Sequence, residues 1–286
     1  MPNSKIIRTA PETQEEKEWI PPEGTLGALV ASANARASRL SRSLDAAQIR
    51  EGRAGVTPLS AALEGENVAI IAEIKRSSPS KGSINPEIDS GVQARLYEAG
   101  GASAISVLTE PEKFGGSEGD IVHVRASSSL PVLKKDFHVS EIQIVHAASL
   151  GVAAALVIVR AVSPRQLEML SQAAKDNSLE LVFEVRDEIE LERALDLDAR
   201  VIGVNNRNLE TLEVDPCTVE RIVPLIPRDR IAIAESGYSS VESIASAARA
   251  GADAVLIGSH VSASADPAGA IREIASIPKS RSGRGR

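Results

Sequence analysis

Lysine and glutamate side chains stand at the ends of several short apolar runs in this chain of 286 residues. Glu73 and Lys75 close the run VAIIAEIK, Lys135 follows the apolar start of PVLKKDF, and Glu184 interrupts ELVFEV. Ammonium and carboxyl groups can deliver protons to a reacting carbonyl and remove them again. A carboxylate between apolar residues is costly to bury without a partner. Glu184 is therefore either a catalytic candidate or one half of an ion pair that only fixes packing.

Glycine and serine follow the last two apolar runs of the chain, in AESGY and LIGSH. Ser236 and Gly237 lie after the first of these runs, and Gly258 and Ser259 lie after the second. Glycine lets an anion approach the backbone closely, and the N–H groups of such turns can donate to phosphate oxygens. The sequence therefore predicts a phosphorylated substrate. In the competing interpretation these glycines serve only the geometry of the turns.

A polar loop, KRSSPSKG, follows the first apolar run and strengthens the phosphate prediction. Its residues Ser78, Ser80, Lys81 and Gly82 would place hydroxyl and basic groups over the same end of the fold. In the alternative interpretation, Ser80 and Gly82 only shape a turn and Lys81 is a solvated charge.

Eight apolar runs supply the elements that would position these groups: VAIIAEIK, SAISVLT, PVLKKDF, AALVIVR, ELVFEV, VIGVNN, IAIAES and AVLIGS. They begin roughly 20 to 35 residues apart with amphipathic stretches between them, which is typical of βα units. The pattern predicts the α/β class and a single (β/α)8 TIM barrel with an N-terminal helical extension. An open doubly wound sheet is the alternative, but no GxGxxG motif follows the first run.

Catalytic groups of such barrels lie at the C-terminal ends of the strands. Because side chains alternate along a strand, residues two apart share a face. Three pairs meet this condition: Glu73 with Lys75, Lys135 with Phe137, and Asn205 with Arg207. By the same rule, Glu184 can face the interior only if Phe183 faces the helices. The second and fourth runs end in Thr109, Glu110 and Arg160, which we rank lower as site residues.

The composition argues against several classes of function. The net charge is −7 and aromatic residues make up 2% of the chain, which disfavours a basic, stacking surface for nucleic acid. The single cysteine, Cys217, cannot form an intramolecular disulfide, and the four histidines lack a metal-binding spacing, so we expect no metal. No apolar run approaches the roughly 18 residues of a membrane helix, and no signal peptide is visible. We expect a cytoplasmic protein with neither a membrane nor a nucleic-acid partner.

Four segments of the chain differ in composition. Residues 1–23 are polar and are expected to be flexible. Residues 24–67 contain Ala, Leu and Arg at helical spacing and are expected to form helices that pack on the barrel. Residues 68–277 would form the barrel, and residues 278–286 a basic, flexible tail.

Seven segments together resemble the indole-3-glycerol phosphate synthase family: IIAEIKRSSPSKG, SVLTEPEKFGGS, PVLKKDF, VFEVRDEIELERAL, IGVNNRNLETLEVD, AESGYSS and GADAVLIGS. They follow the family's order and spacing from about Val68 to Pro267. The resemblance implies a carboxy-lyase of tryptophan biosynthesis. Its substrate would be 1-(2-carboxyphenylamino)-1-deoxyribulose 5-phosphate, and its product indole-3-glycerol phosphate, with loss of CO2 and water. It implies neither a metal nor an organic cofactor.

The resemblance also assigns roles to residues. The implied catalytic residues are Lys135, Glu184, Lys75 and Glu73, with Lys135 as the general acid at the ribulose carbonyl. The implied substrate-binding residues are Ser78, Phe114, Phe137, Asn205, Arg207 and Glu235, and the two rings would sandwich the anthranilate moiety. The implied phosphate-binding residues are Ser236, Gly237, Gly258 and Ser259. On the residues alone, three alternatives stay open: Asn205 caps a turn, Arg207 only pairs with Glu184 or Glu235, and Phe137 only fills the barrel.

The sequence departs from the family pattern at residues 111–113, at Ile142 and at residues 260–264. These departures put loop packing, substrate affinity and the start of the last helix in doubt more than the chemistry. Two other enzyme classes fit the same strand ends: a phosphate-binding sugar isomerase and a Schiff-base aldolase. A binding barrel without turnover is a further alternative. We expect a monomer or a homodimer.

Overall fold

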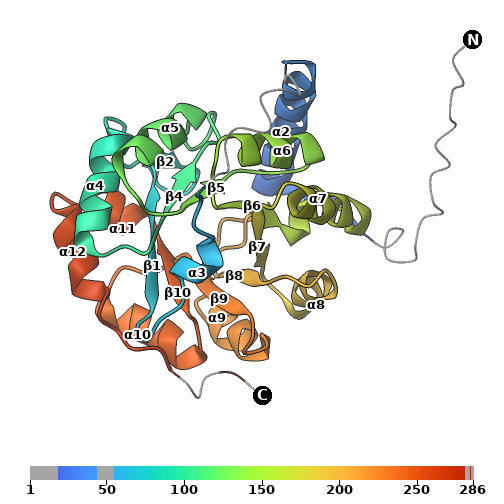
Figure 1. Cartoon of the computed structure of the whole chain (residues 1–286). Helices are drawn as coiled ribbons and strands as arrows, with labels where there is room; N and C mark the ends of the chain where they lie inside the picture. Colours follow the sequence, from blue (N-terminus) through green and yellow to red (C-terminus); the bar gives the residue numbers. More distant parts are fainter. Residues whose placement is uncertain (1–18, 44–54, 281–283, 285–286) are drawn as a thin grey trace, which may run out of the picture.

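A computed structural model of the chain describes residues 19–43, 55–280 and 284. Within these residues, eight parallel strands close into a barrel (Figure 1). In chain order they are β1 (Ala69–Ile74), β4 (Ala104–Leu108), β5 (Val132–Lys135), β6 (Ala154–Ile158), β7 (Glu180–Val185), β8 (Val201–Asn205), β9 (Ile231–Glu235) and β10 (Ala254–Ile257). Closure is direct, since β1 pairs with β10 from Ala69 opposite Ala254 to Ala72 opposite Ile257. The predicted barrel is confirmed, and the open sheet is wrong.

Helices follow the strands and form the outer ring of the barrel (Figure 1). They are α4 (Ser90–Gly100), α5 (Glu118–Ser127), α6 (Glu141–Ser149), α7 (Pro164–Asp176), α8 (Glu188–Asp196), α9 (Cys217–Ile222), α10 (Val241–Ala250), α11 (Ser259–Ser262) and α12 (Pro267–Ile274). Single-turn 3-10 helices lie at Val159–Ala161 and Val223–Leu225. Local signals fix several helix starts, because the side chains of Asp89, Ser163 and Asp187 each accept a hydrogen bond from the first turn.

The core is aliphatic, and the barrel strands are buried along almost their whole length. Ile71, Ile105, Leu133 and Ile202 are among its largest fully buried side chains. Burial on both faces is the expected state of parallel strands that lie between a barrel interior and an outer layer of helices. Ala, Val, Ile and Leu therefore fill a core in which aromatic side chains are few.

The segment before the barrel contains α2 (Gly24–Ser43) and α3 (Leu59–Ala62). The first of these helices lies beside α6 (Figure 1). The second is fixed at the start of β7, where the Ser60 backbone N–H and hydroxyl donate to the Glu180 carboxylate at 2.8 and 2.5 Å. Residues 1–18 and most of 281–286, predicted to be flexible, lie outside the described residues. In the part of the chain that is described, no helix is both long and apolar enough to cross a membrane.

Candidate active site

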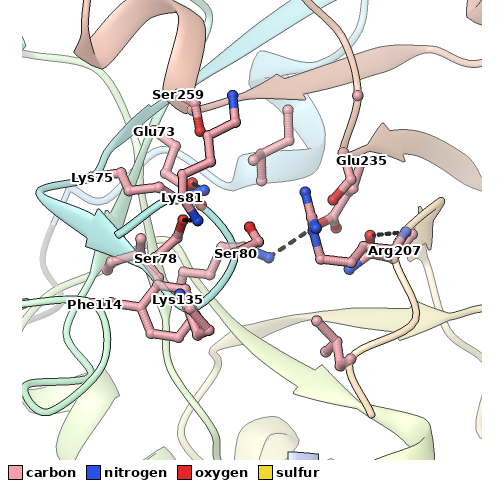
Figure 2. Close-up of a pocket in the computed structure, with 18 of the residues that line it drawn as sticks. Glu73, Lys75, Ser78, Ser80, Lys81, Phe114, Lys135, Arg207, Glu235 and Ser259 are labelled. Carbon is pink, nitrogen blue, oxygen red and sulfur yellow. Dashed lines mark hydrogen bonds and ion pairs between the residues drawn. The ribbon is translucent and has the colours of Figure 1, made fainter. Parts of the chain in front are cut away.

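The C-terminal ends of the strands surround a cavity of about 620 Å³. Every site residue predicted from the sequence lines it: Glu73, Lys75, Ser78, Phe114, Lys135, Phe137, Glu184, Asn205, Arg207, Glu235, Ser236, Gly237, Gly258 and Ser259. Figure 2 shows Glu73 and Lys75 on one side of this space and Arg207 and Glu235 on the other, and the Lys135 side chain reaches Glu235. Phe183 is buried but does not line the cavity, as the alternation of side chains in β7 requires. The predicted positions therefore converge in space.

Lys135 ends β5 and lies between two buried carboxylates. Its Nζ atom is 2.9 Å from Glu235 Oε2 and 3.2 Å from Glu184 Oε2. Burial by itself would lower the pKa of Lys135, but the negative charges of Glu235, Glu184 and Glu73 outweigh this and hold the pKa well above its usual value. Lys135 is therefore an ammonium group at neutral pH, with protons to donate and no tendency to act as a free amine.

A second ion pair joins Glu73 and Lys75, two residues apart at the end of β1. Together with Lys135, Glu184 and Glu235 these residues form what we call the Lys–Glu cluster, which has three carboxyl and two amino groups. The excess of carboxylates affects the pKa of Glu235, whose side chain is only 2% exposed. Burial raises the pKa of Glu235 to about 7, and the charges of Glu184 and Glu73 add to this while the Lys135 ammonium opposes it. The cluster therefore retains a titratable proton near neutral pH.

Two glycines make room for the buried carboxylates of this cluster. A β-carbon at Gly203 on β8 would collide with Glu235 Oε1, and one at Gly258 would collide with Glu73 Oε1. Gly203 was not predicted as a site residue. It lies between Ile202 and Val204 on β8, a position that resembles ordinary strand packing, and the approach of Glu235 from β9 explains the glycine.

Asn205 ends β8 and has two hydrogen-bonding roles. Its Nδ2 donates to Glu184 Oε1 at 2.9 Å, and its Oδ1 accepts from the Arg207 backbone N–H at 2.9 Å. The turn-capping alternative is thus correct, but it accounts for only half of the side chain. Arg207 donates to the Leu212 carbonyl at 2.7 Å. Within the described residues it makes no ion pair with Glu184 or Glu235, so the alternative that it only pairs with them is wrong.

Phe114 and Phe137 are in direct contact at one wall of the cavity. Their ring centroids are 6.2 Å apart and the ring planes are inclined by 38°. An aromatic ring inserted between two others needs about 7 Å between the outer rings, because stacked carbons lie about 3.5 Å apart. In this conformation the two rings pack on each other, and the sandwich of a substrate ring between them stays a prediction.

The turn after β9 has an unusual backbone that another side chain holds in place. Ser236 and Gly237 have φ of 67° and 91°, in the left-handed region that disfavours serine. The Asn206 Nδ2 group donates to the Ser236 carbonyl at 3.1 Å, while its Oδ1 accepts from the Val219 N–H at 3.0 Å. Sequence reasoning missed Asn206, although its place in the VNNRN string beside Asn205 was a signal that could have identified it.

The loop after β1 forms a small hairpin, β2 (Ser77–Ser78) and β3 (Gly82–Ser83), at the rim of the cavity. Ser78, Ser80 and Lys81 line the cavity, whereas Gly82 does not. The Lys81 backbone N–H donates to Ser78 Oγ at 3.2 Å, as Figure 2 shows. Gly82 has φ of 66°, so for this residue the turn-shaping alternative is the correct one.

The N-terminal helix α2 contributes to the site in a way that sequence reasoning did not predict. Thr25 and Leu29 line the cavity. Further along α2, Arg36 makes two hydrogen bonds of 2.9 and 2.8 Å to the carboxylate of Asp136, the neighbour of Lys135. Burial alone would raise the pKa of Asp136, but the Arg36 guanidinium holds it well below its usual range. No local sequence pattern predicts a contact between two residues that are 100 positions apart.

Of the groups that end the lower-ranked strands, Thr109 donates to Asp136 at 2.6 Å, whereas Glu110 and Arg160 serve loop structure. Glu110 accepts hydrogen bonds from the backbone N–H groups of Lys113 and Phe114 at 2.7 and 3.1 Å. Arg160 pairs with Glu210 at 2.9 Å. In residues 19–43, 55–280 and 284, no group of three or more His, Cys, Asp or Glu side chains is arranged to bind a metal ion.

Comparison with known proteins gives one family for almost the whole chain. The family model described as Indole-3-glycerol phosphate synthase matches residues 30–274. The "Indole-3-glycerol phosphate synthase" of Streptomyces griseus is 45% identical over 79% of this chain and 85% of that protein. The "Indole-3-glycerol phosphate synthase 1" of Streptomyces coelicolor is 46% identical over 80% of this chain and 84% of its own length. A solved structure, thiamine phosphate pyrophosphorylase from Pyrococcus furiosus, is similar in fold alone, with a TM-score of 0.54 at 13% identity over 72% of this chain and 93% of its own.

Proposed function

Because the chain belongs to the indole-3-glycerol phosphate synthase family, we propose that its Lys–Glu cluster performs the proton transfers of that family's reaction. The reaction is the decarboxylating ring closure of 1-(2-carboxyphenylamino)-1-deoxyribulose 5-phosphate in tryptophan biosynthesis. An aromatic carbon attacks the ribulose carbonyl carbon, the carboxyl group leaves as CO2, and loss of water completes the indole. Each of these steps balances with protons alone, so the proposal involves no electron or group carrier.

The observation on which the proposal rests is the ammonium of Lys135 between Glu184 and Glu235. As the carbonyl carbon is attacked, negative charge develops on its oxygen, and Lys135 donates a proton there. Glu184 orients Lys135 and is itself held by Asn205. The second pair, Glu73 with Lys75, supplies a further acid and base for the dehydration. The burial of the three carboxylates strengthens each of these interactions relative to water.

The same ammonium argues against the aldolase alternative. A Schiff base forms only when a neutral amine attacks a carbonyl. Enzymes that use lysine in this way lower its pKa, whereas the carboxylates around Lys135 raise it. Acid catalysis is the role that fits this environment.

Substrate binding follows from the remaining walls of the cavity. The phosphate would lie against the turns at Ser236, Gly237, Gly258 and Ser259, with Ser78 and Lys81 at the rim. The anthranilate ring would pack on Phe114, Phe137 and Leu29, which give an apolar surface. Arg207 and Glu235 would face the groups between these two ends. A cytoplasmic location and a monomeric or homodimeric state stay predictions.

The test is turnover by the purified chain. Given the carboxyphenylamino substrate, it should produce the fluorescence of an indole, and no turnover at saturating substrate would overturn the proposal. Treatment with borohydride during turnover separates acid catalysis from the aldolase alternative. We expect no covalent adduct, whereas an adduct at Lys135 would favour the Schiff base.

A further inference from the structure

We propose that the buried hydroxyl of Ser262 is a positioning group for Lys75, fixing the end of β1 against α11 on the phosphate side of the cavity. The inference rests on the proposed function, since it concerns the same site. Ser262 lies in the segment 260–264, where the sequence departs from the family pattern. It does not line the cavity, and its role lies in what its side chain contacts behind the cavity wall.

The backbone of β1 needs a partner at this point. The ladder between β1 and β10 ends with Ala72 opposite Ile257, after which the chain leaves β10 for α11. The Glu73 carbonyl and the Lys75 N–H therefore extend beyond the last pair with β10. Buried backbone groups without a partner are strongly destabilising, so something other than a strand must satisfy these two.

Ser262 satisfies both of them. Its Oγ donates to the Glu73 carbonyl at 2.8 Å and accepts from the Lys75 N–H at 3.2 Å. Ser262 is 1% exposed, so water does not compete for these bonds. A single hydroxyl thus bonds to the backbone of both Glu73 and Lys75, the two residues of the ion pair. It fixes the backbone from which the Lys75 side chain extends.

A second buried hydroxyl completes the arrangement. Tyr97 of α4 is fully buried, and its OH group lies 3.1 Å from the Glu73 carbonyl and 3.2 Å from Ser262 Oγ. Burial raises the pKa of Tyr97 to about 12, so its phenol stays a donor. The Glu73 carbonyl is therefore held by two hydroxyls from two helices, and these two hydroxyls also contact each other.

Ser262 also ties α11 to the neighbouring loop. Its backbone N–H donates to the Gly258 carbonyl at 2.9 Å, which closes the turn containing Ser259. Its carbonyl accepts from Asn85 Nδ2 at 3.2 Å, just after the β2–β3 hairpin. Glu73, Lys75 and Ser259 lie together in Figure 2 at this meeting of β1 and α11. Ser262 thus connects the proposed phosphate turn to the backbone that bears the Glu73–Lys75 pair.

The experiment compares two substitutions of nearly equal shape, Ser262→Thr and Ser262→Val, together with Ser262→Ala. A displacement of catalytic groups by about 1 Å can cost on the order of a hundredfold in rate. For this indirect effect we expect kcat to fall about tenfold in the Ala and Val variants. KM should change by less than about threefold, and the Thr variant should retain most of kcat because it keeps the hydroxyl. Ser171→Ala, at a buried serine of α7, is the matched control and should keep the wild-type kcat.

Equal kcat values for the folded Thr and Val variants would overturn the inference, as would an Ala variant within twofold of wild type. If substitution at position 262 prevents folding, Tyr97→Phe decides, because it removes the second hydroxyl on the Glu73 carbonyl and also the contact that this hydroxyl makes with Ser262 Oγ. We expect Tyr97→Phe to lower kcat without raising KM, and an unchanged kcat would overturn the inference. A wild-type chain without turnover would instead refute the proposed function itself. The two failures are thus distinguishable.

Discussion

The excess negative charge of the Lys–Glu cluster should make the stability of the protein depend on pH through Glu235. In the folded protein burial raises the pKa of this carboxyl to about 7, whereas its ordinary value is 4.5. Between these two pH values the unfolded chain has released the proton and the folded protein retains it. The folded state therefore binds more protons, and stability falls as pH rises through this window. Because a tenfold change in a proton-binding constant is worth about 1.4 kcal/mol, the total loss is about 3 kcal/mol.

The perturbation that isolates this effect is Glu235→Gln, which keeps the shape of the protonated carboxyl and removes its titration. Urea unfolding at pH 5 and pH 8 should show that the variant gains about 2 to 3 kcal/mol relative to wild type at the higher pH. Glu168→Gln, at an exposed position of α7, controls for loss of a solvated glutamate. If the difference between Glu235→Gln and wild type is the same at both pH values, the assignment of the retained proton to Glu235 is wrong.

Three further predictions concern the same cavity and its support. Glu184→Gln should lower kcat by about 10² to 10⁴ with a small change in KM in the steady-state fluorescence assay, and an unchanged rate would exclude a role for this carboxylate. In wild type, kcat should vary with pH near pH 7, where Glu235 titrates, and in Glu235→Gln this dependence of kcat on pH should be lost. Identical profiles of kcat against pH would contradict this prediction. Arg36→Ala should reduce the free energy of unfolding by about 2 kcal/mol, because it removes the guanidinium partner of the buried Asp136 carboxylate. Arg42→Ala on the exposed side of α2 is its control in urea unfolding, and equal losses in both variants would show that the Asp136 contact contributes nothing.

Much of the site could be predicted because a barrel converts position in a strand into position in space. Glu73 and Lys75, or Asn205 and Arg207, share a face through the alternation of side chains, and that face becomes the cavity wall once the strands close. The exclusion of Phe183 from the cavity follows from the same rule. These predictions needed only local periodicity and the knowledge that parallel strands end at the same rim.

Residues whose function depends on distant partners could not be predicted in this way. In the sequence, Arg36 is an ordinary basic residue of a helix, and only the structure shows its contact with Asp136. Ser262 is likewise one serine among several in its segment, and only the structure shows its bond to the Glu73 carbonyl. The tilted contact between Phe114 and Phe137 depends on two loops whose relative placement no spacing encodes. In each case the signal lies in a contact between segments far apart in the chain.

The sequence by itself determined the order of strands and helices, the residues at the strand ends and the membership of the family, because these depend on local patterns and strings of residues. Only the tertiary structure decided how the charges of Lys135, Glu184 and Glu235 act on one another. Electrostatic interaction depends on distance and burial, and both arise when separate strands converge on one buried space. The same glutamate that is ordinary in an extended chain thus becomes a proton-retaining group at the centre of the barrel.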